Sequence, residues 1–172
     1  EEVAAKAAAV EEFKRVGALK VPQPLYNVYV SEADAQSRSL VDETADWMSQ
    51  PQRAASERAV SLAHSLAGNS ATVGFADLSQ LARSLEHALS RSVKRGSTAA
   101  GDAAFFHDVA GDIQRLVQAF AAGSLEAPNP AFTSKLAELA EDRAAPTVRT
   151  VTGTEDEDID AIDAIDPELF EI

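Results

Sequence analysis

Residues 62–89 of the sequence read LAHSLAGNSATVGFADLSQLARSLEHAL, and their pattern is the main indication of how the chain folds. Apolar residues recur at helical spacing on both sides of Gly74, first as Leu62, Leu66 and Val73 and then as Leu78, Leu81, Leu85 and Leu89. A glycine between two such patterns ends one helix and lets the chain reverse into the next. The stretch therefore predicts a hairpin of two antiparallel helices.

Two more amphipathic patterns flank this hairpin. The preceding one begins at a capping-box-like pair, Ser31 and Asp34, and ends at Pro51. The following one carries apolar residues at the same helical period: Phe105, Phe106, Val109, Ile113, Leu116, Val117 and Phe120. Four helices with short connections predict an all-α protein built as an antiparallel four-helix bundle over residues 30–125.

Additional segments lie outside this bundle. We expect an extra N-terminal helix within residues 1–20, ended by Gly17, which caps the bundle or belongs to a preceding module. We also expect a short C-terminal helix within residues 126–144, followed by an acidic disordered linker over residues 145–165. Residues 166–172 begin with Asp166-Pro167, which resembles a capped helix start, and we expect them to open a next module of a longer chain.

Composition and charge exclude several classes of protein. The chain has 172 residues, no cysteine and a net charge of −13, so it repels nucleic acid and anionic membrane surfaces. Nine of its acids lie between Glu155 and Glu171, where no lysine or arginine occurs. No apolar run reaches the roughly 18 residues of a membrane helix. We expect a cytoplasmic, monomeric module without nucleic-acid binding or membrane insertion.

One histidine faces away from the predicted core. At about 100° per residue, His64 lies far around the helix from both Leu62 and Leu66, so we expect its side chain to be exposed. Gly68 follows one turn later, where glycine costs about 1 kcal/mol relative to alanine. Its missing side chain clears space beside the imidazole. The alternative interpretation is a solvated surface histidine.

A glutamate on the next helix is placed to meet this histidine. His64 and Glu86 are each about eleven residues from residue 75, so an antiparallel hairpin brings them to the same height, about 16 Å from the turn. A carboxylate that accepts a hydrogen bond from Nδ1 fixes the tautomer and leaves Nε2 nucleophilic. The alternative is a solvated carboxylate at the edge of the interface.

The pattern from Ala63 to Phe75 resembles the phosphorylation-site signature of histidine phosphotransfer (HPt) domains, His-x-x-Lys-Gly-x-[Ser/Ala]. The segment from Leu81 to Leu89 resembles the family's following helix, with its glutamate at the same separation. The resemblance is strongest to modules repeated in chemotaxis-like hybrid sensor histidine kinases that regulate pili and twitching motility. It implies a domain that accepts a phosphoryl group on His64 and exchanges it with an aspartate of a receiver domain.

One position departs from the family pattern. Ala67 stands where the family usually has lysine, so part of the charge that stabilises a phosphoryl group is absent. We expect either that Arg83, one turn before Glu86, replaces that charge, or that it is a solvated surface residue.

The chain lacks the motifs of an enzyme that binds nucleotide. It has no GxxxxGK[ST] loop, so ATP and Mg²⁺ are expected to come from a partner, either the kinase catalytic domain or the receiver. His87 and His107 have no ligand spacing to each other and are expected to be structural. The fragment is thus expected to be a relay rather than an enzyme, within a parent histidine kinase. The alternative is a helical spacer or docking bundle that carries no phosphate.

Overall fold

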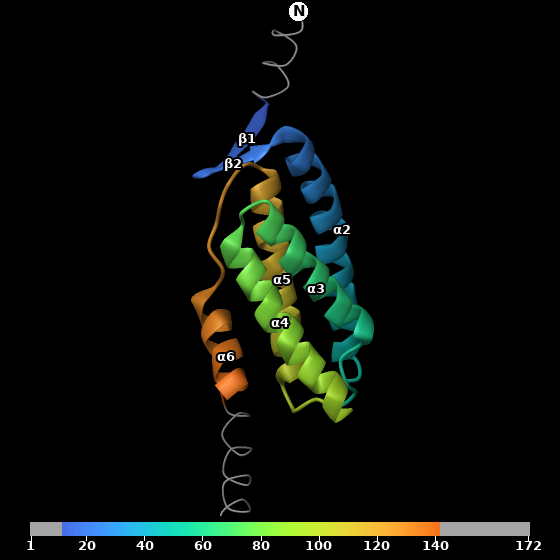
Figure 1. Cartoon of the computed structure of the whole chain (residues 1–172). Coiled ribbons are helices and arrows are strands. Elements are labelled where there is room, and N and C mark those ends of the chain that lie inside the picture. The colour runs from blue at the N-terminus through green and yellow to red at the C-terminus, as the bar shows by residue number, and fades with distance from the viewer. Residues whose placement is uncertain (1–11, 142–172) are drawn as a thin grey trace, which may run out of the picture. The chain divides into compact units, whose positions relative to one another are not determined.

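The computed structural model describes residues 12–141, which form a mostly helical bundle (Figure 1). Two short strands, β1 (Phe13–Val16) and β2 (Leu19–Pro22), precede the helices. The helices are α2 (Gln23–Met48), α3 (Glu57–Thr72), α4 (Ala76–Arg95), α5 (Asp102–Ala121) and α6 (Pro130–Glu141). The chain divides into two compact units, residues 1–136 and 137–172, and the described part of the second is the end of α6. The expected acidic linker and next module lie outside the described residues.

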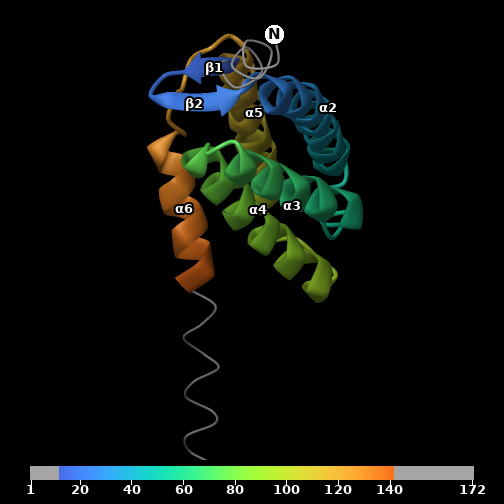
Figure 2. The ribbon, with the colours of Figure 1, turned by 45° about the horizontal axis from the view of Figure 1, so that its top comes forward.

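The core lies between four long helices. α2 packs against α3 and α5, and α3 packs against α4, as the two views of the ribbon show (Figure 1, Figure 2). Phe120 of α5 is fully buried and contacts the rings of Tyr26, Tyr29 and Phe75 at centroid distances of 5.8, 5.1 and 5.2 Å. Trp47 stacks on Phe106 with 5.5 Å between the ring centroids. The chain has few aromatic residues, and those named here lie in the core, where they fill the space between helices.

Gly74, with a φ of 84°, lies in the turn that the sequence predicts between α3 and α4. α4 ends at Arg95, and Gly96 takes the left-handed conformation that closes a helix. α3 and α4 lie on either side of Gly74, and α6 lies within the expected range of residues 126–144. Helical periodicity was therefore a sufficient guide for these elements.

The expected N-terminal helix is wrong for residues 13–16, which form β1. The strand pairs antiparallel with β2, and Gly17 lies in the turn with a φ of 56°. Val16 and Val21 face inward and are buried, whereas Arg15 and Lys20 are exposed. Alternating burial with a period of two is a strand pattern, and four residues are too few to distinguish it from helical spacing. Residues 1–11 lie outside the described part of the chain.

The first bundle helix begins earlier than predicted. Ser31 lies inside α2, which starts at Gln23 with Pro24 in its first turn. Proline is tolerated there because the first backbone N–H groups of a helix have no partner within it. The pair Pro22 and Pro24 therefore marks the start of a helix rather than a break between helices, and the bundle extends beyond its expected limit at residue 30.

A charged cluster fixes the connection after α5. Asp112 is mostly buried, accepts hydrogen bonds from Arg115 at 2.9 and 2.7 Å, and accepts one from the backbone N–H of Asn129 at 2.9 Å. Arg115 also donates to Glu126 at 2.5 Å and to the carbonyl of Ala127 at 3.0 Å. Asp112 and Arg115 of α5 thus hold residues 126–129, the end of the loop that leads to α6.

Candidate functional site

The helix that carries the candidate site begins at a side-chain cap. Ser56 Oγ accepts a hydrogen bond from the backbone N–H of Ala59 at 3.0 Å, and Glu57 places a negative charge in the first turn of α3. Buried residues recur along one side: Ala59, Ala63, Leu66, Ala67 and Ser70. The other side of α3 faces solvent and carries the histidine.

His64 is exposed and bound at one ring nitrogen. Its side chain is 72% exposed, and Nδ1 lies 2.9 Å from Oε1 of Glu86, whose own side chain is 18% exposed. Because an ionised carboxylate only accepts hydrogen bonds, this contact places a proton on Nδ1, and in the neutral imidazole the lone pair is then on Nε2. The structure brings together the two residues that the spacing around residue 75 places at equal height.

Gly68 leaves open space next to this histidine. A Cβ atom built at Gly68 would meet no neighbouring heavy atom within 4 Å. The glycine therefore serves no close packing in the unmodified protein, although it lies in the interior of α3 and carries the usual helix penalty. The carbonyl of Gly68 accepts a hydrogen bond from Thr72 Oγ1 at 3.0 Å.

Ala67 is covered by α4. It is 1% exposed, and its carbonyl accepts a hydrogen bond from Ser79 Oγ at 2.8 Å. A longer side chain at position 67 would have to pass along α4 to reach solvent. Arg83 lies on α4 between Ser79 and Glu86, is exposed, and makes no hydrogen bond or ion pair with any residue from 12 to 141.

A second set of contacts positions α3 against α2, and sequence analysis did not identify it. The hydroxyl groups of Tyr29 and Ser70 lie 2.8 Å apart in the core. Burial raises the pKa of Tyr29 to about 12. Nearer the surface, Asn69 donates to Gln36 at 3.3 Å and to Glu32 at 3.5 Å. Such pairs join residues more than thirty positions apart, so no local pattern reveals them.

The other histidines lie apart from this arrangement. Nδ1 of half-buried His107 lies 2.9 Å from Thr44 Oγ1, which links α5 to α2. His87 is exposed beside Glu86. Across residues 12–141, no group of three or more His, Asp or Glu side chains could hold a metal ion. In the same range, no helix is long and apolar enough to cross a membrane.

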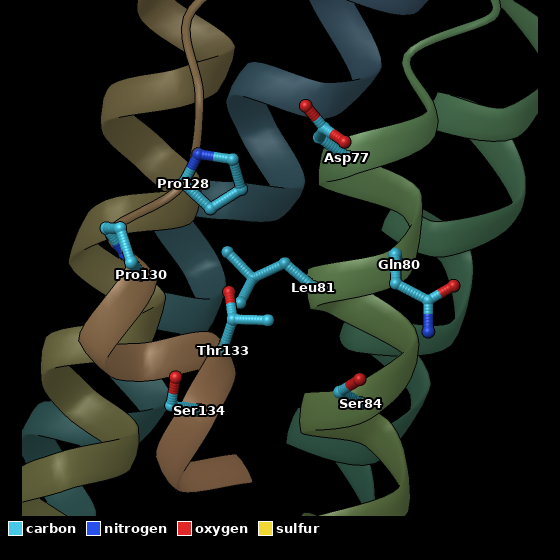
Figure 3. Close-up of a pocket in the computed structure, with 8 residues that line it drawn as sticks. All are labelled: Asp77, Gln80, Leu81, Ser84, Pro128, Pro130, Thr133 and Ser134. Atoms are coloured by element: carbon cyan, nitrogen blue, oxygen red, sulfur yellow. The ribbon is translucent and has the colours of Figure 1, made fainter. Parts of the chain in front are cut away.

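A groove of about 360 Å³ lies between α4 and the start of α6. Figure 3 shows Leu81 of α4 and Thr133 of α6 pointing toward each other across it, with Pro128 and Pro130 at its rim. On α4, Leu81 lies roughly 140° around the helix from Glu86, so the groove opens on another side of α4 from His64. The groove is thus separate from the candidate site.

α3 thus presents a largely exposed histidine that a carboxylate of α4 binds at Nδ1. The family model of the Hpt domain matches residues 24–123, more than half of the chain, and the protein therefore belongs to the Hpt family. No curated protein and no solved structure matches the chain. Hpt domains are histidine phosphotransfer modules of phosphorelays rather than kinases, and they typically interact with kinases and receiver domains.

Proposed function

We propose that His64 is the phosphoacceptor of this Hpt domain and that it exchanges its phosphoryl group with an aspartate of a receiver domain. The observation that carries the proposal is the exposed imidazole whose Nδ1 is held by Glu86 at 2.9 Å. In this tautomer Nε2 is both nucleophilic and open to solvent. Helices α2 to α5 would then form the antiparallel four-helix bundle that supports the site.

The transfer follows from the tautomer. The lone pair of Nε2 attacks phosphorus, the bond from phosphorus to the aspartate oxygen breaks, and that oxygen leaves with the electron pair. The imidazole then carries phosphate on Nε2, a proton on Nδ1 and a positive charge. Glu86 stabilises that charge through the same hydrogen bond. Transfer back to an aspartate reverses these steps, and the ring leaves as neutral imidazole.

The partner domains supply what this chain lacks. We propose that ATP comes from a histidine kinase catalytic domain and that Mg²⁺ comes from the kinase or the receiver, since phosphoryl transfer needs charge neutralisation by a metal ion. The parent chain would then be a chemotaxis-like hybrid histidine kinase of the type that regulates twitching motility. The module itself would act as a cytoplasmic monomer.

The direct test is phosphorylation of the 172-residue chain by the kinase core of its parent protein with ATP and Mg²⁺. We expect an acid-labile, alkali-stable label that is lost in His64→Gln. Phosphoramidate, a small donor that phosphorylates imidazole nitrogen, gives a second assay that requires no protein partner. A folded chain that takes no label in either assay would favour the alternative, a spacer bundle.

Gly68 provides the matched test of space beside the histidine. We expect Gly68→Leu to slow transfer from a phosphorylated receiver at least tenfold while the protein stays folded. Gly111→Leu is the control, because Gly111 is also a helical glycine whose added Cβ would meet nothing within 4 Å. Equal transfer rates in the two variants would contradict the proposed role of Gly68.

A further inference from the structure

We infer that the phosphoryl group on His64 lies over Gly68 and is bound there by the guanidinium of Arg83. This inference rests on the proposed function, since it requires phosphate on Nε2. Arg83 would be a catalytic residue in the strict sense, because it touches the group that is transferred. It would also account for a phosphoryl site that contains no lysine at position 67.

Two contacts fix where Arg83 lies relative to α3. Ser79 bonds to the carbonyl of Ala67 at 2.8 Å, and Glu86 bonds to His64 at 2.9 Å. Both contacts connect the same two helices, and Arg83 lies between their α4 residues. Ser79 and Arg83 are one turn apart and share a side of the helix, with Glu86 about 60° from Arg83. The backbone of Arg83 is therefore next to residues 64–68 of α3.

The charge of Arg83 is available. Its side chain is exposed and has no partner among residues 12–141, and Glu86, the nearest carboxylate on its own helix, is engaged with His64. An arginine presents several N–H donors in a planar fork that matches two phosphate oxygens. His87, on the next turn of α4, is the other titratable group on this side.

Other cations are placed less well. Arg38 is paired with Asp34 at 3.0 Å, and Arg58 is paired with Glu43 at 3.2 Å. Lys94 lies eleven residues beyond Arg83 on α4, about 16 Å along the helix axis. Among these cations, Arg83 alone combines proximity to His64 with an unpaired side chain.

The open volume over Gly68 gives the phosphoryl group a place. Gly68 lies one turn beyond His64 on the same side of α3, and no atom would contact a Cβ at this position within 4 Å. The backbone of Arg83 lies on α4 opposite this stretch of α3, between the contacts made by Ser79 and Glu86. A phosphoryl group on Nε2 could therefore contact the guanidinium without displacing any packed side chain.

The test uses phosphoramidate and ³¹P NMR on the 172-residue chain, which removes any need for a protein partner. The ³¹P shift of phosphohistidine followed against pH gives the pKa of the phosphoryl group. We expect Arg83→Gln to raise that pKa by about 0.5 to 1 unit, because a nearby cation favours the dianion. We also expect phosphorylation to slow roughly threefold to tenfold. Arg83→Lys should restore part of both effects.

Lys94→Gln is the matched control, since it removes one positive charge from the same helix farther from His64. A phosphoryl pKa in Arg83→Gln that equals that of the unaltered chain would overturn the inference. So would an equal shift in Lys94→Gln, because the effect would then reflect net charge alone. If the unaltered chain gives no phosphohistidine signal that depends on His64, the proposed function itself fails.

Discussion

The hydrogen bond between His64 and Glu86 joins the imidazole of the proposed phosphoacceptor to the carboxylate that orients it. Glu86 is mostly shielded from solvent while His64 is not, so the carboxylate can hold the ring without blocking Nε2. Because His64 is largely exposed, this bond contributes only about 0 to 1 kcal/mol to folding, whereas it stabilises the cationic phosphorylated imidazole more strongly. Losing this one should therefore have a measurable effect on the reaction but little effect on the fold.

We expect Glu86→Ala to lower the rate of His64 phosphorylation by phosphoramidate roughly tenfold to hundredfold. Mass spectrometry of the chain over time measures the rate, and circular dichroism checks the helical content. Glu32→Ala is the control, because Glu32 is also a surface carboxylate that accepts a hydrogen bond from α3, but from Asn69. A Glu86→Ala rate within twofold of that control would refute the role of Glu86 in holding the ring.

The raised pKa of the buried Tyr29 predicts that the protein loses stability at high pH. The pKa of Tyr29 is about 12 in the folded protein and about 10 in the unfolded chain. The contribution of this difference to the free energy of unfolding is therefore complete below pH 10 and is lost as pH rises through 12. The difference corresponds to roughly 2 to 3 kcal/mol. Urea unfolding at pH 8 and pH 11 should show a steeper decline for the unaltered chain than for Tyr29→Phe. Parallel declines would contradict a buried, protonated tyrosine.

At the scale of elements, the helices that could be predicted are those with long, regular patterns. α3 and α4 follow from apolar residues at helical spacing on either side of Gly74, and their pairing places Glu86 opposite His64. The β-hairpin formed by β1 and β2 could not be predicted, because strands of four residues carry too little periodicity. The contact between Tyr29 and Ser70 was missed for another reason, since it depends on how α2 packs against α3.

The cluster around Asp112 predicts that α6 can be loosened without affecting the site. Asp112→Ala removes the acceptor for Arg115 and for the N–H of Asn129, which should cost about 1 to 3 kcal/mol. Hydrogen exchange should accelerate in residues 126–136, while phosphoramidate still labels His64 at the normal rate. Asp108→Ala, which changes an exposed residue of the same helix, should leave both hydrogen exchange in residues 126–136 and the labelling rate unchanged. Slower labelling in Asp112→Ala would show that α6 and the site are coupled.

At the scale of the molecule, the face around His64 is electrically divided. Toward α2 it carries Glu32, and toward α4 it carries Arg83 and, farther along, Lys94. A protein partner that covers His64 must meet both signs of charge, whereas a small donor need not. The net charge of −13 hides this local pattern, because nine of the acids lie between Glu155 and Glu171.

This division predicts how the partner is oriented. Glu32→Lys and Lys94→Glu should each slow transfer from a phosphorylated receiver domain about threefold to tenfold at low salt, with the difference shrinking at 0.5 M NaCl. Neither change should alter labelling by phosphoramidate, since that reaction requires no docking. Asp108→Lys on α5 is the control for a charge change away from the face. If receiver transfer in all three variants matches that of the unaltered chain, the partner is held by apolar contacts around His64, and charge does not set its orientation.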